Sequence, residues 1–222
     1  MSHYTDLWQR TTGLLASLLI PALTLGSAPP AGAAPTLLVW GDSLSAAYGI
    51  PRDRGWVALL RDRLKARGIT VVNASVSGET TQGGLSRLPE ALQRVKPAIV
   101  ILELGANDGL RGLPLKHMKA KLSTMIELAK DAGAKVLLVG MRLPPNYGPT
   151  YTRRFARIYH EIADRKKIPL LPFLLDGIAD DFDKMQADGL HPNVSAQPRI
   201  LENVWPLLNP LLDDGAIGTI RK

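Results

Sequence analysis

The chain contains no cysteine. Its absence excludes a disulfide framework, a zinc–thiolate site, an iron–sulfur cluster and a catalytic thiol. It also removes the side chain through which a bacterial lipid anchor is attached. The rest of the composition is ordinary for a globular protein, with 45% hydrophobic and 21% charged residues over 222 positions. Such a chain is neither a disordered tail nor a low-complexity linker, and its length fits one domain, or two small ones at most.

The N-terminal region lacks an apolar run long enough to cross a membrane. Residues 13–25 are apolar and uncharged, but these thirteen positions are interrupted by Pro21, and a bilayer takes about 18 or more. Residues 31–33, Ala-Gly-Ala, then match the small-x-small pattern of a cleavage site. We therefore predict a secretory signal peptide over residues 1–33 and a mature domain over residues 34–222, located in the periplasm or secreted.

Positive charge is the one unusual feature of the composition, with a formal net charge of +7. Residues 1–33 contain one arginine and one aspartate, so the whole excess stays with the mature domain. The densest run of cations, residues 153–167, predicts a solvated helix face. Such a face could also make transient contact with an anionic lipid surface. No nucleic-acid-binding motif accompanies the charge, so we expect no nucleic-acid partner.

Short apolar runs alternate with segments of helical spacing along the mature domain. The runs predict strands over residues 36–40, 69–74, 99–104, 135–141 and 169–173. The helical segments cover residues 56–64, 115–132, 151–167 and 194–212. Continuous apolar strands separated by amphipathic helices predict an α/β fold with a five-stranded parallel sheet, right-handed connections and helices on both faces. In such sheets, ligands bind at the carboxyl ends of the strands.

Polar residues capable of nucleophilic catalysis follow these strands or stand in a late loop. Ser43 and Asn107 come directly after two of the strands, and Asp188 and His191 share one Gly- and Pro-containing loop. A serine hydroxyl is a weak nucleophile unless an imidazole accepts its proton. The imidazole in turn needs an acceptor on its other nitrogen, which fixes its tautomer and orientation. The spacing of Asp188 and His191 allows one short segment to supply both groups.

A tetrahedral intermediate on such a serine would carry an oxyanion, which needs preorganised hydrogen-bond donors. The backbone N–H of Ser43, the backbone N–H of Gly78 and the side-chain amide of Asn107 are the candidates. Gly78 suits this role because a residue without Cβ lets the backbone approach a substrate closely.

Four short motifs resemble the sequence blocks of the GDSL-type, or SGNH, serine esterases. They are Gly41-Asp-Ser-Leu44, Gly78, Gly105-x-Asn107-Asp108 and Asp188-x-x-His191, and they occur in the family's order between residues 36 and 192. The residues that flank these blocks are similar to the bacterial multifunctional thioesterase, lysophospholipase and arylesterase branch of that family.

The resemblance implies a fold, a mechanism and a substrate class. The fold would be a flavodoxin-like three-layer α/β/α sandwich, and the reaction would need no metal or cofactor. Ser43 would be the nucleophile, His191 the general base and Asp188 its orienting partner, with Ser43, Gly78 and Asn107 forming the oxyanion hole. The substrates would be small acyl esters, thioesters or lysophospholipids. We expect a monomer.

The apolar, proline-rich segment of residues 143–149 is a candidate wall for the acyl chain. Leu143 and Tyr147 in this segment, with Leu110 and Leu113 from the loop after the third strand, are the predicted lining residues. The alternative is that the prolines only stiffen a connection between two elements.

Four other ionisable residues have simpler interpretations. Asp42 and Asp108 adjoin candidate catalytic positions, and we expect them to stabilise turns through bonds to backbone groups instead of transferring protons. His117 and His160 lie in helical segments beside lysine or arginine, and we expect both at the surface.

Two other functions share parts of this pattern. A carbohydrate O-deacetylase would use the same catalytic residues, but the three phenylalanines of the chain provide few rings for a sugar-binding cleft. A non-catalytic binding module would be expected to lack at least one of Ser43, Asn107, Asp188 and His191, and all four are present.

Overall fold

The structure is a computed structural model that describes residues 34–213. Five parallel strands form one sheet, in the order β2-β1-β3-β4-β5. The strands are β1 (Thr36–Gly41), β2 (Thr70–Asn73), β3 (Ile99–Glu103), β4 (Lys135–Val139) and β5 (Leu170–Leu171). The predicted parallel sheet is therefore confirmed, and its strand order is the flavodoxin-like one. The predicted fifth strand, residues 169–173, shortens to two residues at the sheet edge.

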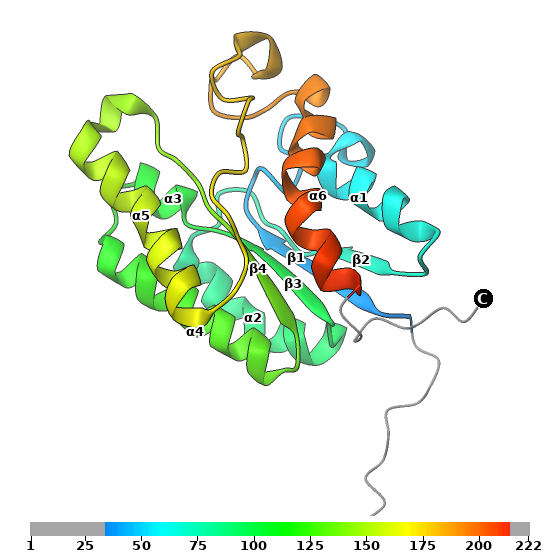
Figure 1. The fold of residues 1–222 in the computed structure, drawn as a ribbon. Helices are drawn as coiled ribbons and strands as arrows, with labels where there is room; N and C mark the ends of the chain where they lie inside the picture. The colour runs from blue at the N-terminus through cyan, green and yellow to red at the C-terminus, as the bar shows by residue number, and fades with distance from the viewer. Residues whose placement is uncertain (1–33, 214–222) are drawn as a thin grey trace, which may run out of the picture. The chain divides into compact units, whose positions relative to one another are not determined.

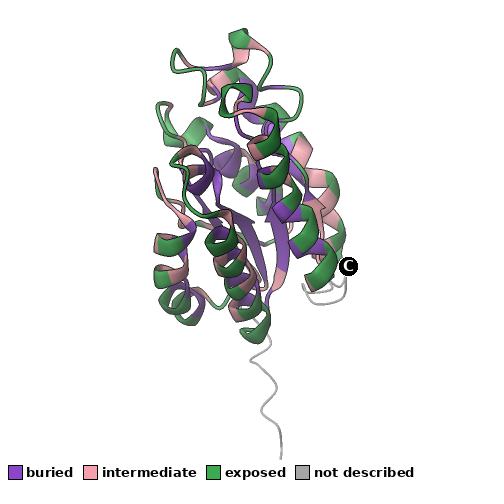
Figure 2. Ribbon diagram, turned by 90° about the vertical axis from the view of Figure 1, so that its left-hand side faces the viewer, coloured by how far each residue is buried: buried purple, intermediate pink, exposed green. Residues whose placement is uncertain are grey.

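Helices cover both faces of the sheet (Figure 1). They are α1 (Trp56–Lys65), α2 (Thr81–Val95), α3 (Ala106–Leu110), α4 (Leu115–Asp131), α5 (Pro149–Lys166) and α6 (Gln197–Asp213). Helices α1 and α6 pack together on one side, and α2, α4 and α5 form the other layer. The central strands are purple and the outer helix faces green in Figure 2, which separates the buried core from the exposed surface. The α/β/α sandwich expected from the sequence is confirmed.

The structure adds two helices, α2 and the five-residue α3, and corrects the start of α6. Helix α2 was not predicted, since Gly83, Gly84 and Pro89 obscure its pattern. The Thr80 side chain caps it by accepting the Gly83 N–H. Pro89 stands in the helix interior on an exposed face, where its missing N–H costs one hydrogen bond within the helix. The final helix starts at Gln197 instead of residue 194, because residues 194–196 form a separate 3-10 turn.

The exposure of the cations on α5 agrees with the solvated face predicted for residues 153–167. Five of the six cations of residues 153–167 are exposed, and the sixth, Lys166, is half-buried. This confirms the predicted solvated face of α5. None of the helices within residues 34–213 is long and apolar enough to cross a membrane. The predicted signal peptide, residues 1–33, lies outside the described residues.

The strand order places one crevice at the carboxyl edge of the sheet. Strands β1 and β3 are neighbours, but the chain leaves β1 toward β2 and leaves β3 toward β4. Loops that diverge in this way leave a space between them, which is where open α/β sheets bind ligands. The residues after β1 and β3 therefore meet at this edge.

Candidate active site

Ser43 stands on a tight turn that starts where β1 ends. Asp42 and Leu44 on either side of it are buried, whereas Ser43 is partly exposed. The Leu44 N–H donates to Asp42 Oδ1 at 3.1 Å, which closes the turn. Glycine is required at position 41, because a Cβ there would lie 2.5 Å from the Glu103 Oε2 atom. The turn is thus held from below by buried groups, and its serine faces outward.

The loop that carries Asp188 and His191 brings both side chains to Ser43. The His191 Nε2 atom lies 2.9 Å from Ser43 Oγ, and the Nδ1 atom lies 2.7 Å from Asp188 Oδ2. The other carboxylate oxygen, Oδ1, accepts the backbone N–H groups of Leu190 at 2.9 Å and of His191 at 3.0 Å. The predicted Ser, His and Asp side chains therefore form one continuous chain of hydrogen bonds.

The environment keeps Asp188 ionised. Its partial burial alone would raise the pKa, but the N–H groups of His191 and Leu190 and the His191 side chain outweigh this effect. Together they lower the pKa of Asp188 to about 2. A carboxylate in this state accepts from His191 Nδ1–H and leaves the Nε2 lone pair facing Ser43.

Two further residues tie the His191 loop to the Ser43 turn, and sequence analysis did not find them. The Gln186 side chain donates to the Tyr48 carbonyl at 2.8 Å and to the Pro192 carbonyl at 3.1 Å. The Tyr48 ring lies against His191, with ring centroids 4.5 Å apart. The Gln186–Tyr48 bond joins positions 138 residues apart and uses a backbone acceptor, so no local sequence pattern could have predicted it.

The three candidate oxyanion donors come from three different loops. Within residues 34–213, the N–H groups of Ser43 and Gly78 donate to no protein acceptor. Gly78 has φ of +77°, which favours glycine, and its carbonyl accepts from Arg111 at 2.9 Å. Asn107 lies at the start of α3 and donates one amide hydrogen to Asp42 Oδ2 at 3.1 Å. An amide carries two such hydrogens, so the second is left for another acceptor.

A cavity of about 450 Å³ opens beside these groups. Ser43, Asn107 and His191 contribute to its wall, and the charged residues in the wall are Asp42, Arg142 and Asp180. Most of the other lining is apolar. Those residues are Leu44, Ala106, Leu110, Met141, Leu143, Pro144, Pro145, Phe173, Leu175, Ala179, Met185 and Leu190. The nucleophile candidate therefore faces a mainly hydrophobic space.

The predicted lining residues divide into two groups. Leu110 and Leu143 line the cavity. Tyr147 and Leu113 do not line it, contrary to expectation. The Tyr147 hydroxyl donates to the Leu110 carbonyl at 2.9 Å and its ring stacks on Tyr151, so it braces the wall from behind. Spacing in the sequence did not distinguish these two positions.

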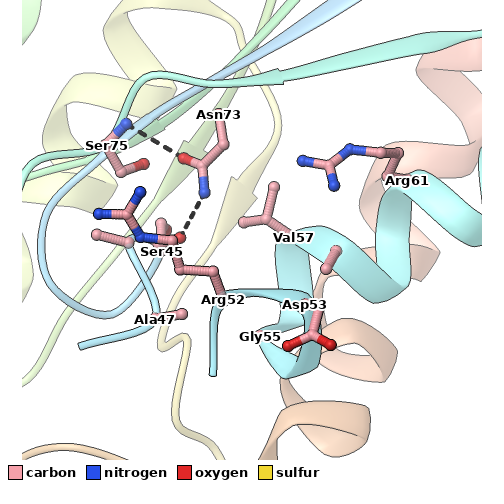
Figure 3. A pocket seen from close by; sticks show the side chains of 11 residues that line it. Ser45, Ala47, Arg52, Asp53, Gly55, Val57, Arg61, Asn73 and Ser75 are labelled. Atoms are coloured by element: carbon pink, nitrogen blue, oxygen red, sulfur yellow. Dashed lines mark hydrogen bonds between the residues drawn. The ribbon is translucent and has the colours of Figure 1, made fainter. Parts of the chain in front are cut away.

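A second cavity, of about 490 Å³, lies on the next stretch of the Ser43 turn (Figure 3). Ser45, Ala46 and Ala47 line it, together with Arg52, Asp53, Gly55, Val57, Ala58, Arg61, Asn73 and Ser75. The Asn73 side chain donates to the Ser45 carbonyl at 2.7 Å and accepts the Ser75 N–H at 3.1 Å (Figure 3). Ser43, Asp188 and His191 are not among its lining residues. The cavity beside Ser43 is therefore the better candidate for a reaction site.

The other ionisable residues near the site were predicted in part. The Asp42 carboxylate accepts the Leu44 N–H within its own turn, as predicted. The Asp108 carboxylate instead accepts the Thr81 N–H from 27 positions away, so it joins α3 to the start of α2 and does not stabilise its own turn. His117 and His160 are exposed. Within residues 34–213, no group of three or more His, Asp or Glu side chains could hold a metal ion.

Known proteins match this chain over most of its length. Residues 39–197 match the model of the GDSL-like Lipase/Acylhydrolase family. Esterase TesA of Pseudomonas aeruginosa is 52% identical over 199 residues, which is 89% of this chain and 99% of the relative. Thioesterase 1/protease 1/lysophospholipase L1 of Escherichia coli strain K12 is 44% identical over 183 residues, 82% of this chain and 88% of the relative.

A solved structure supports the same relationship. The crystal structure of TesA superposes with a TM-score of 0.78 at 54% sequence identity, covering 80% of this chain and 99% of that one. The match of the family model spans all four sequence motifs, and the matching structure shares the fold described above. The chain belongs to the GDSL-like lipase/acylhydrolase family.

Proposed function

We propose that this protein is a serine hydrolase that cleaves carboxylic acyl esters and thioesters through an acyl-Ser43 intermediate. One observation carries the proposal: the hydrogen-bonded chain from Asp188 through His191 to Ser43 ends at a mainly apolar cavity. The names of the relatives, an esterase and a thioesterase/lysophospholipase, support the same reaction class.

Acylation starts with proton transfer from Ser43 to His191. The Ser43 oxygen attacks the carbonyl carbon of the substrate while His191 Nε2 accepts the hydroxyl proton. Asp188 stabilises the imidazolium that forms, and it stays ionised because its pKa is about 2. His191 then gives the proton to the leaving alcohol or thiol, and the acyl group stays on Ser43.

Deacylation repeats these steps with water as the nucleophile. His191 accepts a proton from the water, which attacks the acyl-Ser43 carbonyl. The second tetrahedral intermediate collapses as His191 returns the proton to Ser43, and the carboxylic acid leaves. No further group is needed for proton balance.

The oxyanion of each intermediate would be held by the Ser43 N–H, the Gly78 N–H and the Asn107 side-chain amide. The two backbone donors have no acceptor among the described residues, and the Asn107 amide is fixed by Asp42. Donors already oriented before the reaction stabilise the developing charge without reorganisation.

The cavity favours acyl esters of apolar chains as substrates. Leu110, Leu143 and Phe173 are among the side chains that would contact an acyl chain, and Phe173 is the single Phe, Tyr or Trp in the lining. A carbohydrate O-deacetylase would need more polar and stacking groups than this wall supplies. The complete set of Ser43, Asn107, Asp188 and His191 speaks against a non-catalytic binding module.

We further propose that the mature enzyme is monomeric and is exported to the periplasm or secreted. The signal-peptide pattern of residues 1–33 supports export. The net charge of +7 on the remaining chain favours a monomer, because like-charged copies repel one another. The solvated cations of α5 would allow transient contact with anionic lipid, the surface that presents lysophospholipid substrates.

Covalent labelling tests the proposed nucleophile. An alkyl phosphonate ester should label the wild-type enzyme once and abolish hydrolysis of an aryl ester, because the phosphonate mimics the tetrahedral intermediate. Mass spectrometry of the digest should place the label on Ser43. Ser86→Ala, a change on the exposed face of α2, is the control that should label normally. Labelling of Ser43→Ala at the wild-type rate would refute the assignment.

A panel of p-nitrophenyl esters and acyl thioesters from acetyl to palmitoyl then defines the substrate class. Chain-length dependence of kcat/KM is expected from the apolar wall. Faster turnover of acetylated sugars than of any acyl ester would instead support the deacetylase.

A further inference from the structure

Two carboxyl groups lie buried beneath the Ser43 turn, and the mechanism above uses neither as an acid or a base. Glu103, the last residue of β3, is fully buried, and Asp42 is 1% exposed. Neither forms an ion pair with any described residue. Burying even one unpaired carboxylate costs several kcal/mol by order of magnitude, so two adjacent unpaired carboxylates would not be stable here.

The hydrogen bonds show which carboxyl accepts and which must donate. Both oxygens of Asp42 accept: Oδ1 from the Leu44 N–H and Oδ2 from the Asn107 amide, each at 3.1 Å. Glu103 Oε2 also accepts twice, from the Asp42 N–H at 3.2 Å and from the Ser45 hydroxyl at 2.7 Å. Glu103 Oε1 is buried and receives no donor from the described residues. The bond from the Asp42 N–H to Glu103 Oε2 places the two residues side by side beneath the turn, and the negative charge of Asp42 acts on Glu103.

We propose that Glu103 is held as the neutral acid, with its proton on Oε1 donated to the Asp42 carboxylate. This assignment gives a partner to the one oxygen of the pair that receives no donor, and it leaves a single charge in the pair. This protonation state makes Glu103 a positioning residue for the reaction, a role that rests on the proposed function. Glu103 fixes Asp42, Asp42 fixes one amide hydrogen of Asn107, and the other amide hydrogen is thereby aimed at the cavity that Ser43 faces.

Other ionisable groups around the pair are compatible with this charge state. The charge of His191 lowers the pKa of Asp42, so the imidazolium that forms during catalysis would favour the ionised Asp42 carboxylate. Tyr159 is fully buried with its hydroxyl donating to the Leu104 carbonyl at 3.0 Å. Asp108 is engaged by Thr81. Burial raises the pKa of Glu103 well above its usual range, and the charge of Asp42 raises it further.

Three variants of position 103 test the proposal. Glu103→Gln keeps the shape, both acceptor bonds through its carbonyl oxygen, and a donor to Asp42 through its amide. Its kcat should stay within about threefold of wild type. Glu103→Leu removes the donor and should lower kcat by roughly ten- to a hundredfold, less than the 10²–10³ reported for deleting an oxyanion donor. KM should hardly change, because the effect is on the transition state.

A double variant tests the route through Asn107. Since Glu103 acts by aiming the Asn107 amide, Glu103→Leu should cost little further activity once Asn107→Ala has removed that amide. Tyr159→Phe is the matched control, because it removes a buried hydroxyl near the same strand end without touching Asp42. It should leave kcat unchanged.

The outcomes separate this inference from the proposed function. Equal loss of kcat in Glu103→Gln and Glu103→Leu would show that the carboxylate is required, and full additivity with Asn107→Ala would exclude the Asn107 route. Infrared difference spectra of wild type minus Glu103→Gln should show a protonated carboxyl band at neutral pH, even if Glu103→Leu does not fold. Absence of that band overturns the proposal whatever the activity. Retained activity of Ser43→Ala would instead contradict only the proposed function.

Discussion

Asp188 binds the loop that carries His191 through both of its carboxylate oxygens. Oδ1 accepts two backbone N–H groups, and Oδ2 faces His191 Nδ1. A single residue therefore shapes the loop and sets the histidine tautomer. At this scale the chemistry depends on which nitrogen of His191 carries the proton, since Nε2 must be free to accept from Ser43.

Asp188→Asn should lower kcat by roughly 10⁴-fold, the loss that a serine protease shows when its triad aspartate becomes asparagine. The amide would donate to His191 Nδ1 and leave the proton on Nε2, where it faces Ser43. Steady-state kinetics measures the loss, and thermal unfolding checks that the fold is intact. Asp180→Asn, also in the cavity wall, is the control and should remain active. Activity of Asp188→Asn near the wild-type level would remove Asp188 from the mechanism.

Among the structural elements, the loops after β1, β2, β3 and β4 and the His191 loop form the site. The His191 loop is joined to the Ser43 turn by the Gln186 side chain, which bonds to the Tyr48 and Pro192 carbonyls. The site therefore depends on the relative position of two loops that are far apart in the sequence.

Gln186→Ala should lower kcat by roughly tenfold with little change in KM, because a small displacement of reacting groups weakens catalysis more than binding. Rates with a short acyl ester give the comparison. Gln82→Ala, on the exposed side of α2, serves as the control. A Gln186→Ala enzyme with wild-type kcat would mean that other contacts fix the His191 loop.

The wall formed by α3 and the loop after β4 should select the acyl chain. Leu110→Ala removes apolar surface from the cavity and should weaken turnover of long-chain esters relative to short ones by about 1–2 kcal/mol, roughly five- to thirtyfold in the ratio of kcat/KM values. Tyr147→Phe deletes a hydroxyl behind the wall and should leave that ratio unchanged. An unaltered ratio in Leu110→Ala would place the acyl chain elsewhere.

For the whole molecule, the buried carboxyl pair links stability to pH. Burial raises the pKa of Asp42 to about 6, despite the opposing Leu44 N–H, and raises that of Glu103 well above its usual range. Unfolded carboxyl groups titrate near about 4, so above this pH the folded state binds more protons than the unfolded state. The free energy of unfolding therefore falls as pH rises from about 4 to the folded-state pKa values. Asp188 acts oppositely, but only below about pH 4.

Glu103→Gln should reduce this pH dependence. Relative to the variant, the wild type should lose up to about 1.4 kcal/mol of stability per pH unit between about pH 5 and 8, because only the wild-type unfolded chain gains from ionising residue 103. Urea unfolding of both proteins across this range measures the difference. Parallel curves would show that Glu103 is ionised in the folded protein.

Most of the architecture could be predicted because apolar runs and helical spacing are local features of the sequence. Apolar runs such as residues 99–104 mark buried strands, and Leu115–Asp131 has helical spacing that the structure reproduces within one residue. Helix α2 escaped prediction because two glycines and a proline lower its local propensity. Its burial against the sheet and α4 compensates, and packing of this kind cannot be read from propensity.

The site could be predicted only in part, for a similar reason. Ser43, Asn107 and His191 follow from their types and from their positions after strands or in a late loop. The cavity wall was harder, since Leu110 lines it while Tyr147 stands behind it. Side-chain direction in a loop depends on contacts from other elements, which spacing does not specify.

The parallel sheet, the family and the identity of the candidate reacting groups could all be inferred from the chain alone, because periodicity and short motifs are local properties. The three-dimensional structure was needed to show that Ser43, His191 and Asp188 lie within hydrogen-bond distance, that Gln186 joins two loops, and that Glu103 lies beneath Asp42. These contacts join residues up to 148 positions apart. They exist because the order of parallel strands brings the ends of β1 and β3 to one edge of the sheet.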